Sequence, residues 1–320
     1  MKNKVQLRVV SIPPVIWIVL ALFVLYSFFA PGFFSAGNLW NIGVQAAPLL
    51  VLAIGATIVI LTEGIDLSCG IVLGFAGVGF ALLAQRGFPI WLAMLGGILL
   101  AGVCGLVNGV MVACLHLPPF IATLGMASVI TGAGLVSTEG MSIAVRDDVL
   151  EFVSNGAPLG IKMPILIALL IFGVVLFLMR FTAFGRNIYA LGGNSEALRL
   201  SGANLTAAQI ATYTVAGLLA GIAGILVASR TASGHITAGL GWDFDAIAAT
   251  IIGGTSFEEG KGGVAYTILG VVLIAVLRNG LNVAGVPNMY QFALIGTVVL
   301  GAIIFDIWFG ACPGRRRAGE

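Results

Sequence analysis

The segment Gly185–Asn204, with the sequence GRNIYALGGNSEALRLSGAN, is a polar, glycine-bounded stretch in a chain that is otherwise mostly apolar. Asn194 can cap the start of a helix, and Glu196 then lies in the first turn, where the helix dipole favours a carboxylate. Gly202 suits the left-handed residue just past a helix end. The pattern predicts a helix of about two turns, which is too short to be stable alone in water and must pack against other helices or a partner protein.

Apolar runs flank this segment on both sides, Pro164–Met179 before it and Thr206–Ala228 after it. The segment is therefore expected to be a loop of about residues 181–205 between two membrane spans. An ordinary cytoplasmic loop with a surface helix would show the same pattern. The choice between this reading and a specific docking role depends on the individual residues.

Those residues resemble the cytoplasmic loop of sugar permeases in ATP-binding cassette importers. The matching positions are Gly185-Arg186, Ala190–Asn194, Glu196-Ala197 and Leu200–Gly202. Three further segments resemble ribose-type permeases and follow in the right order: Thr62–Ser68, Pro118–Gly125, and Asp245–Ala249 running to Ile252–Ser256. The similarity covers roughly residues 38 to 306.

The resemblance implies a permease subunit that moves a monosaccharide, a ribose-like pentose or a hexose, across the inner membrane by alternating access. A separate ATPase subunit would drive it, a soluble binding protein would deliver the substrate, and a second permease copy or paralogue would complete the path within the lipid. In this family the loop carries a short helix that docks into a cleft of the ATPase. The residues expected to contact the ATPase are Arg186, Asn194, Glu196, Ala197, Leu198, Arg199, Leu200 and Gly202. Among them the charged residues would orient the contact, and Ala197, Leu198 and Leu200 would fill the cleft.

The composition indicates an integral membrane protein. Hydrophobic residues make up 59% of the chain and charged residues 9%, with a mean hydropathy of +1.11. A soluble domain carries about 25% charged residues, so this chain lacks the groups that coat a water-facing surface. The net charge of +2 comes with no basic stripe, which argues against a nucleic-acid partner.

The fold is predicted to be all-α and polytopic, a single permease domain over residues 1–320 with about ten transmembrane helices and both termini cytoplasmic. The apolar runs are 12–30, 48–61, 71–85, 90–115, 120–136, 164–179, 206–228, 243–254, 264–282 and 290–308. In this topology the inner side receives Lys2, Lys4, Arg8, Arg180, Arg186, Arg199, Lys261 and Arg315–Arg317, and the outer side Arg86, Arg146, Lys162 and Arg230. This excess of basic residues on the inner side is the bias expected of a membrane protein.

Two segments have features that leave more than one structure open. The stretch Thr62–Gly70 places Glu63 and Asp66 between glycines. We favour a hydrated turn at the inner interface, and the alternative is a broken helix beside the permeation path. The run 243–254 is short, so it is either a partial span or a re-entrant helix.

The path itself is expected to be weakly polar, because the binding protein supplies most of the substrate specificity. Its candidate lining residues are Asp66, Asn108, Phe120, Thr123, Asn279 and Asn282. Hydrogen bonds between helices are the commoner role of such residues and remain the alternative. Gly97, Ala101, Gly105 and Gly109 follow one another at intervals of four, which predicts a helix face that a neighbouring helix approaches closely.

The outer loop of about residues 139–163 carries most of the charges on its side. The residues proposed to dock the binding protein are Arg146, Asp147, Asp148, Glu151 and, from the next outer loop, Arg230. A charge run of this kind is also typical of a plain solvated surface.

The sequence contains no catalytic, metal or cofactor motif. The two histidines and four cysteines form no ligand cluster. Gly254–Gly262 departs from a phosphate-binding loop, because five residues separate Gly254 from Gly260-Lys261 and Gly262 replaces the required hydroxyl. ATP hydrolysis is therefore expected in a partner. Import of a nucleoside, an autoinducer or a branched-chain amino acid is an alternative, and an ion-coupled transporter is a second one, although Arg278 is the only clear mid-span charge.

Overall fold

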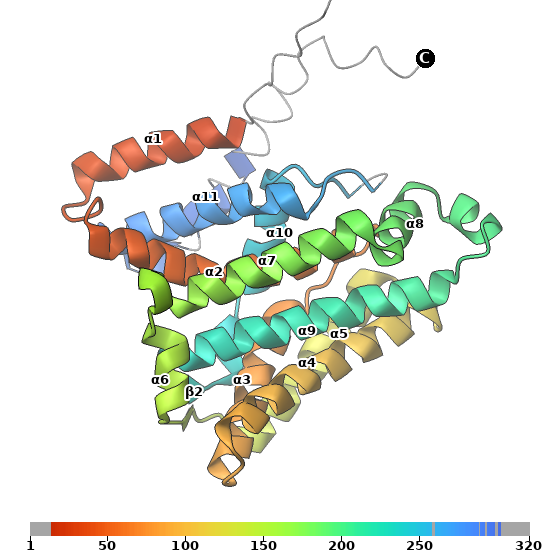
Figure 1. Cartoon of the computed structure of the whole chain (residues 1–320), viewed down its shortest axis with the longest axis horizontal. Helices are drawn as coiled ribbons and strands as arrows, with labels where there is room; N and C mark the ends of the chain where they lie inside the picture. Colours follow the sequence, from red (N-terminus) through yellow and green to blue (C-terminus); the bar gives the residue numbers. More distant parts are fainter. Residues whose placement is uncertain (1–13, 258–259, 288, 292, 298–299, 302–320) are drawn as a thin grey trace, which may run out of the picture.

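The chain folds as a bundle of α-helices (Figure 1). The computed structural model describes residues 14–301 except 258–259, 288, 292 and 298–299. Its helices are α1 (Pro14–Phe29), α2 (Ala36–Ile60), α3 (Cys69–Gln85), α4 (Ile90–Ala113), α5 (Pro119–Thr138), α6 (Asp148–Asn155), α7 (Met163–Phe181), α8 (Ala183–Leu200), α9 (Leu205–Thr231), α10 (Trp242–Ile252) and α11 (Val264–Val283). The short elements are the strands β1 (Ile143–Ala144) and β2 (Ser233–Gly234) and the 3₁₀ helices η1 (Pro158–Gly160) and η2 (Ile236–Gly239). The two chain ends that were predicted to be cytoplasmic, with their basic residues, lie outside the described residues.

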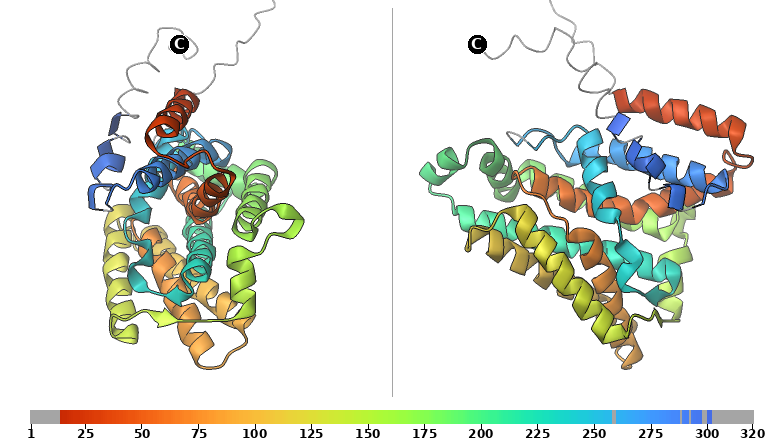
Figure 2. Two further views of the ribbon diagram at one scale, coloured as in Figure 1. Left: turned by 90° about the vertical axis from the view of Figure 1, so that its left-hand side faces the viewer. Right: turned by 180° about the vertical axis from the view of Figure 1, so that it is seen from behind.

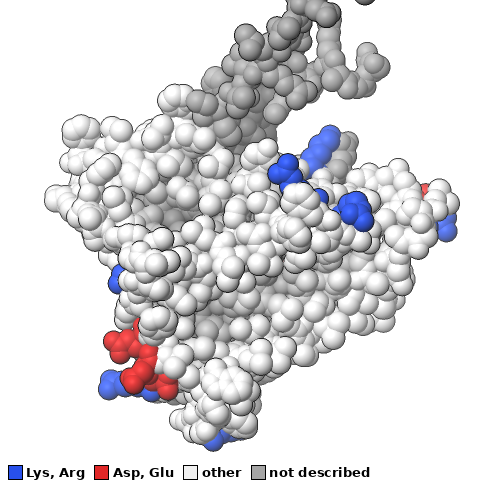
Figure 3. Space-filling view, in the orientation of Figure 1, with Lys and Arg blue, Asp and Glu red and all other residues white. Residues whose placement is uncertain are grey.

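Within the described residues, 6 helices are long and apolar enough to cross a membrane. They are α2, α4, α5, α7, α9 and α11, and α1 and α3 are shorter apolar helices. Figures 1 and 2 show α6 and α8 at opposite ends of the bundle. On the face in Figure 3, charged side chains gather at the α6 end and toward the α8 end, and the surface between them is uncharged. These features confirm a polytopic all-α membrane protein.

Helix α2 is the central helix of the bundle and is longer than predicted. It begins at Ala36, capped by the Ser35 hydroxyl, which accepts the Asn38 N–H at 3.2 Å, so Pro48 lies inside the helix. The prediction that the span starts at Pro48 is therefore wrong. Proline is tolerated inside a membrane helix because the neighbouring helices compensate for the lost hydrogen bond.

The predicted small-residue face of α4 is confirmed, and its neighbour is α9. A Cβ atom built on Gly217 would lie 2.9 Å from the Cα atom of Gly105, and one on Gly109 would lie 2.8 Å from the Cα of Ile210. These distances leave no room for larger side chains. The close approach therefore depends on glycine, as in other membrane helix pairs.

Two long helices, α2 and α9, are each followed by a non-helical stretch and then a helix that packs against the other long helix. Residues 61–68 lead from α2 into α3, which packs on α9, and residues 232–241 lead from α9 into α10, which packs on α2. Gly70, in the first turn of α3, lies against Gly239 of the second stretch. The loop after α10 reaches α8 through Gly260. Residues 235–241 and α10 therefore connect the two ends of the bundle together. Because α10 covers only part of that distance, the apolar run 243–254 is short.

Candidate functional site

The predicted short helix is present at the C-terminal end of α8. Asn194 interrupts α8 with φ −163° and ψ 88°, and its Oδ1 atom accepts a hydrogen bond from the Ala197 N–H at 2.8 Å. At the other end the Ser201 N–H donates to the Ala197 carbonyl, and Gly202 follows with φ +81°. The cap at Asn194 and the left-handed glycine are therefore confirmed. We call residues 194–202 the short helix.

An exposed ion pair lies on the short helix. The Arg199 Nη2 atom is 2.5 Å from Glu196 Oε1, and both side chains are more than half exposed. The hydrogen bond from Arg199 lowers the pKa of the Glu196 carboxyl. A carboxyl with a lowered pKa loses its charge only when the pH falls below the usual carboxyl range, so the pair is ionised at neutral pH.

The apolar residues of the short helix point in two directions. Leu200 is 75% exposed and Ala197 is exposed, whereas Leu198 is only 6% exposed. Leu198 packs within the chain itself, so it is not in a position to fill the cleft of a partner and instead anchors the short helix. Arg186, in the first turn of α8, is exposed.

The first part of α8 packs against the α2–α3 stretch and the α10–α11 loop. Gly192 lies against the backbone of Leu61, where α2 ends, and the glycine at 260 lies against the backbone of Tyr189 and Gly193. The Tyr189 hydroxyl is 3.5 Å from the Gly262 carbonyl oxygen. The segment that carries the short helix therefore contacts both the α2–α3 stretch and the α10–α11 loop.

Three of the predicted path residues converge on the α2–α3 stretch. Asp66 Oδ1 accepts the N–H and the hydroxyl of Ser68 at 2.8 and 2.6 Å, and Asn108 Nδ2 donates to the Ser68 hydroxyl at 2.8 Å. The Thr123 hydroxyl accepts the Leu67 N–H at 3.2 Å. Because Asp66, Asn108 and Thr123 are all buried, the expectation of a hydrated turn is wrong for Asp66. In this conformation the three residues make contacts between helices, which was the alternative role.

The other three predicted path residues do not lie together. Asn279 is buried and exchanges two hydrogen bonds with Asn38, at 2.8 and 3.0 Å. Phe120 is half-exposed on α5. Asn282 lines a cavity to which the other five residues do not belong.

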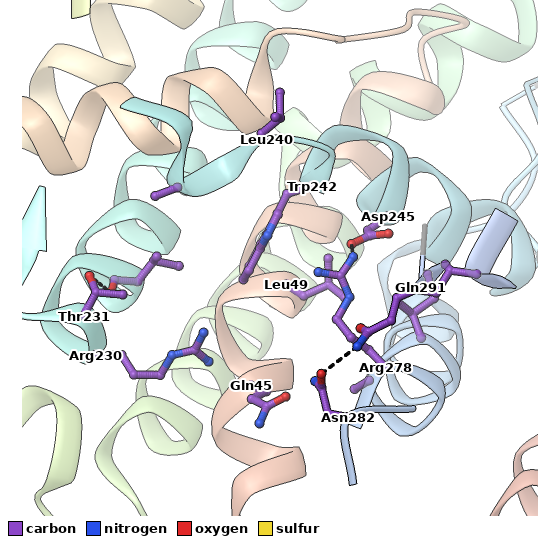
Figure 4. Close-up of a pocket in the computed structure, with 15 residues that line it drawn as sticks. Gln45, Leu49, Arg230, Thr231, Leu240, Trp242, Asp245, Arg278, Asn282 and Gln291 are labelled. Carbon is purple, nitrogen blue, oxygen red and sulfur yellow. Dashed lines mark hydrogen bonds and ion pairs between the residues drawn. The ribbon is translucent and has the colours of Figure 1, made fainter. Parts of the chain in front are cut away.

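This cavity has a volume of about 440 Å³ and lies among α2, α9, α10 and α11 (Figure 4). Its polar lining residues are Gln45, Arg230, Thr231, Trp242, Asp245, Arg278, Asn282 and Gln291. Asp245 and Arg278 form an ion pair. Sequence reasoning did not assign Trp242, Asp245 or Arg278 to a site. The signal that could have found them is the mid-span Arg278, since a charge in a span requires a nearby carboxylate.

Comparison with known proteins identifies the family. The family described as "Branched-chain amino acid transport system / permease component" matches residues 38–303. The chain belongs to this permease family. The permease is therefore a membrane transport subunit and not an enzyme, and the matched range contains the short helix, both non-helical stretches and the cavity.

Curated relatives cover almost the whole permease. The ribose import permease protein RbsC of Escherichia coli (strain K12) is 38% identical over 291 residues, which are 90% of this chain and 91% of the relative. The D-allose transport system permease protein AlsC of the same strain is 34% identical, over 86% and 84% of the two chains. The L-arabinose ABC transporter permease protein AraH of Azospirillum brasilense is 30% identical, over 91% and 86%.

The residues predicted to dock a binding protein lie at the α6 end of the permease. Asp147 caps α6 by accepting the Val149 N–H at 2.8 Å, and Arg146, Asp148 and Glu151 are exposed. β1 pairs with β2 in antiparallel register, Ile143 with Gly234. This pairing joins the loop of about residues 139–163 to the loop that follows Arg230, so the five candidates belong to neighbouring segments.

Proposed function

We propose that the chain is the permease subunit of an ATP-binding cassette importer that moves a monosaccharide across the inner membrane. The observation that carries the proposal is the end-to-end similarity to permeases named for ribose, allose and arabinose. These three names agree on an aldose and favour it over the branched-chain amino acid in the name of the family.

The proposed topology has about ten spans with both termini cytoplasmic. The 6 long helices of the described residues are joined by α1, by the broken spans that contain α3 and α10, and by the run 290–308. The α8 end, which carries Arg180, Arg186, Arg199 and Lys261, is then cytoplasmic by the distribution of basic residues. The α6 end faces the binding protein, which docks on α6 and the β1–β2 pair.

The short helix is the proposed contact with the ATPase. Its exposed Ala197 and Leu200 supply an apolar surface, and the Glu196–Arg199 pair beside them orients the partner. Arg186 adds a second positive charge to that of Arg199. Because α8 also contacts Leu61 and the glycines at 260 and 262, a displacement of the short helix reaches the α2–α3 stretch and the α10–α11 loop directly. Two permease copies moved in this way would open the path to one side of the membrane at a time.

The proposal is tested by replacing Ala197 with tryptophan, or Glu196 with arginine, in the permease expressed with its ATPase. Each change is expected to abolish co-purification of the ATPase while the permease remains folded. Ala36→Trp is the matched control, because Ala36 is exposed at the start of α2, outside the short helix and the β1–β2 pair.

Function is then measured as uptake of labelled D-ribose, D-allose and L-arabinose into proteoliposomes that contain the permease, the ATPase and the binding protein. We expect ATP-dependent uptake of at least one of these sugars. Unchanged assembly in both variants would contradict the docking role. Uptake driven by a proton or sodium gradient without an ATPase would contradict the proposed function.

A further inference from the structure

We propose that the cavity bordered by Trp242 and the Asp245–Arg278 pair is a binding site for a neutral monosaccharide, contained within a single permease chain. This inference rests on the proposed function and locates one sugar site within the permease. It differs from the path predicted from the sequence, of which only Asn282 lines the cavity.

The position of the cavity fits the delivery of substrate from outside. Arg230 is in the last turn of α9, which ends at the α6 end of the bundle, and Asn282 is in the last turn of α11. Helix α11 starts after the loop that contacts α8, so its last turn lies toward the opposite end. In the proposed topology the cavity therefore lies in the outer half of the permease, on the side where the binding protein releases its sugar.

The polar groups of the cavity match the hydroxyls of a sugar. A hydroxyl donates one hydrogen bond and accepts others, and the cavity offers acceptors on Asp245, donors on Arg278 and both on the amides of Gln45, Asn282 and Gln291. Gln291 Nε2 donates to Asn282 Oδ1 at 2.8 Å, which holds these two amides in place. Figure 4 shows this hydrogen bond and the ion pair on the same side of the cavity.

Two further polar side chains have no partner of their own. Among the described residues, Gln45 and Arg230 make neither a hydrogen bond nor an ion pair, and both line the cavity. Figure 4 shows Arg230 and Gln45 below Trp242, with Gln45 next to Asn282. Gln45 is partly buried and Arg230 is exposed, so water can reach both side chains. A ligand with several hydroxyls could replace that water and form hydrogen bonds with groups that the chain itself does not pair.

The remaining lining is apolar and includes the indole of Trp242 together with Leu49 and Ile274. The ring C–H groups of a sugar form an apolar face, which packs well on an aromatic ring. The volume of about 440 Å³ falls within the range of about 300–1,000 Å³ that is usual for small-molecule sites. A monosaccharide and several waters fit this space.

The charges favour a neutral ligand over an anion. Asp245 neutralises Arg278 through their ion pair, so Arg230 is the one lining cation without a carboxylate partner among the described residues. Arg230 is exposed, so water screens its charge, and no lining cation requires an anionic partner. A neutral sugar is therefore sufficient to satisfy the polar groups of the lining.

The experiment uses the complete transporter in proteoliposomes. Replacing Trp242 with alanine, and separately Gln45 with alanine, is expected to lower sugar uptake about tenfold at low substrate concentration. ATPase assembly should be unchanged, because both residues line the cavity and neither belongs to the short helix. Trp91→Ala is the matched control, since Trp91 is exposed at the start of α4 and outside the cavity.

A second measurement detects occupancy directly. Thr231→Cys, at a lining residue to which no sugar contact is assigned, is introduced into a permease whose Cys114 and Cys312 are serine and is labelled with a small water-soluble thiol reagent. D-Ribose, D-allose or L-arabinose, whichever is transported, should slow the labelling, and L-leucine should not.

The outcomes separate this inference from the proposed function. Reduced uptake in the Trp242 and Gln45 variants together with protection by the sugar supports the site. Normal uptake in both variants, or no protection by the transported sugar, overturns the site and leaves the proposed function intact. Protection by leucine alone also overturns it. A wild-type transporter that imports none of the sugars with its ATPase overturns both.

Discussion

Gly192 of α8 lies directly against the backbone carbonyl oxygen of Leu61, the residue that follows the end of α2. The two residues come from segments that are 131 positions apart in the sequence, by subtraction of 61 from 192. This contact joins the segment that carries the short helix to the stretch that leads into α3, so it provides a test of how motion reaches the membrane helices.

Gly192→Ala is expected to uncouple the permease. The new Cβ atom would collide with the Leu61 carbonyl group, because neither backbone can yield without moving its helix. The ATPase should still bind, since the short helix is unchanged, but sugar uptake per ATP hydrolysed should fall severalfold. Both quantities are measured in the same proteoliposomes. Gly173→Ala in α7 is the control, because nothing lies within 4 Å of its built Cβ, and equal coupling in the two variants would contradict the prediction.

Asn194→Ala is expected to weaken ATPase binding without abolishing it. The change removes the hydrogen bond to the Ala197 N–H, and the loss of such a cap costs about 1 kcal/mol. The short helix would then be less ordered, and the affinity of the permease for the ATPase should fall about fivefold. Affinity is measured by titrating the purified ATPase onto the permease in detergent. Asn194→Asp keeps the capping oxygen, so an equal loss in this variant would show that the cap is not the cause.

Thr57→Val is expected to destabilise the bundle. The Thr57 hydroxyl is 2.7 Å from that of Thr267 and 3.1 Å from that of Thr250, so it links α2 to α11 and α10. Interhelical hydrogen bonds of this kind are worth about 1 kcal/mol in membranes, and the thermal unfolding midpoint in detergent should decrease. Thr57→Ser keeps the hydroxyl group, so its unfolding midpoint should stay close to that of the wild type. Thr131→Val is a further control, since the Thr131 hydroxyl bonds within its own helix to the Ala127 carbonyl.

The Asp245–Arg278 pair allows stability and transport to be separated. Asp245→Ala leaves the Arg278 charge unpaired, which is expected to cost about 3–5 kcal/mol and to lower the unfolding midpoint. The double variant Asp245→Leu with Arg278→Met removes both charges, so the midpoint should recover while sugar uptake stays low. Recovery of uptake together with stability would show that the pair is only structural.

Local rules predicted the parts of the molecule that depend on neighbouring residues in the sequence. The cap at Asn194 and the left-handed Gly202 follow from short-range hydrogen bonding and backbone sterics. The glycine face of α4 follows from a spacing of four within one helix. The docking role of the short helix stays a prediction.

Features that depend on contacts between distant segments were not predictable in this way. Pro48 was expected to start a helix, but surrounding helices accommodate it inside α2. Asp66 was expected in water, but Ser68 and Asn108 form a buried hydrogen-bonded cluster with it. The burial of Leu198 and the cavity likewise arise only when separate helices pack. A single sequence carries no direct signal of which helices become neighbours.

The pairing of β1 with β2 has a consequence for synthesis of the protein. Ile143 is hydrogen-bonded to a partner strand whose residue Gly234 leaves the ribosome much later, at about 5–20 residues per second. During those seconds the loop before α6 lacks its partner strand, and of the segments that pack on α6 only α7 follows it at once. Thr57 waits even longer, since Thr250 and Thr267 are made near the end of the chain. Insertion of the early helices and their final assembly are therefore separate events, and the nascent chain remains open to chaperones and proteases until its last third has been translated.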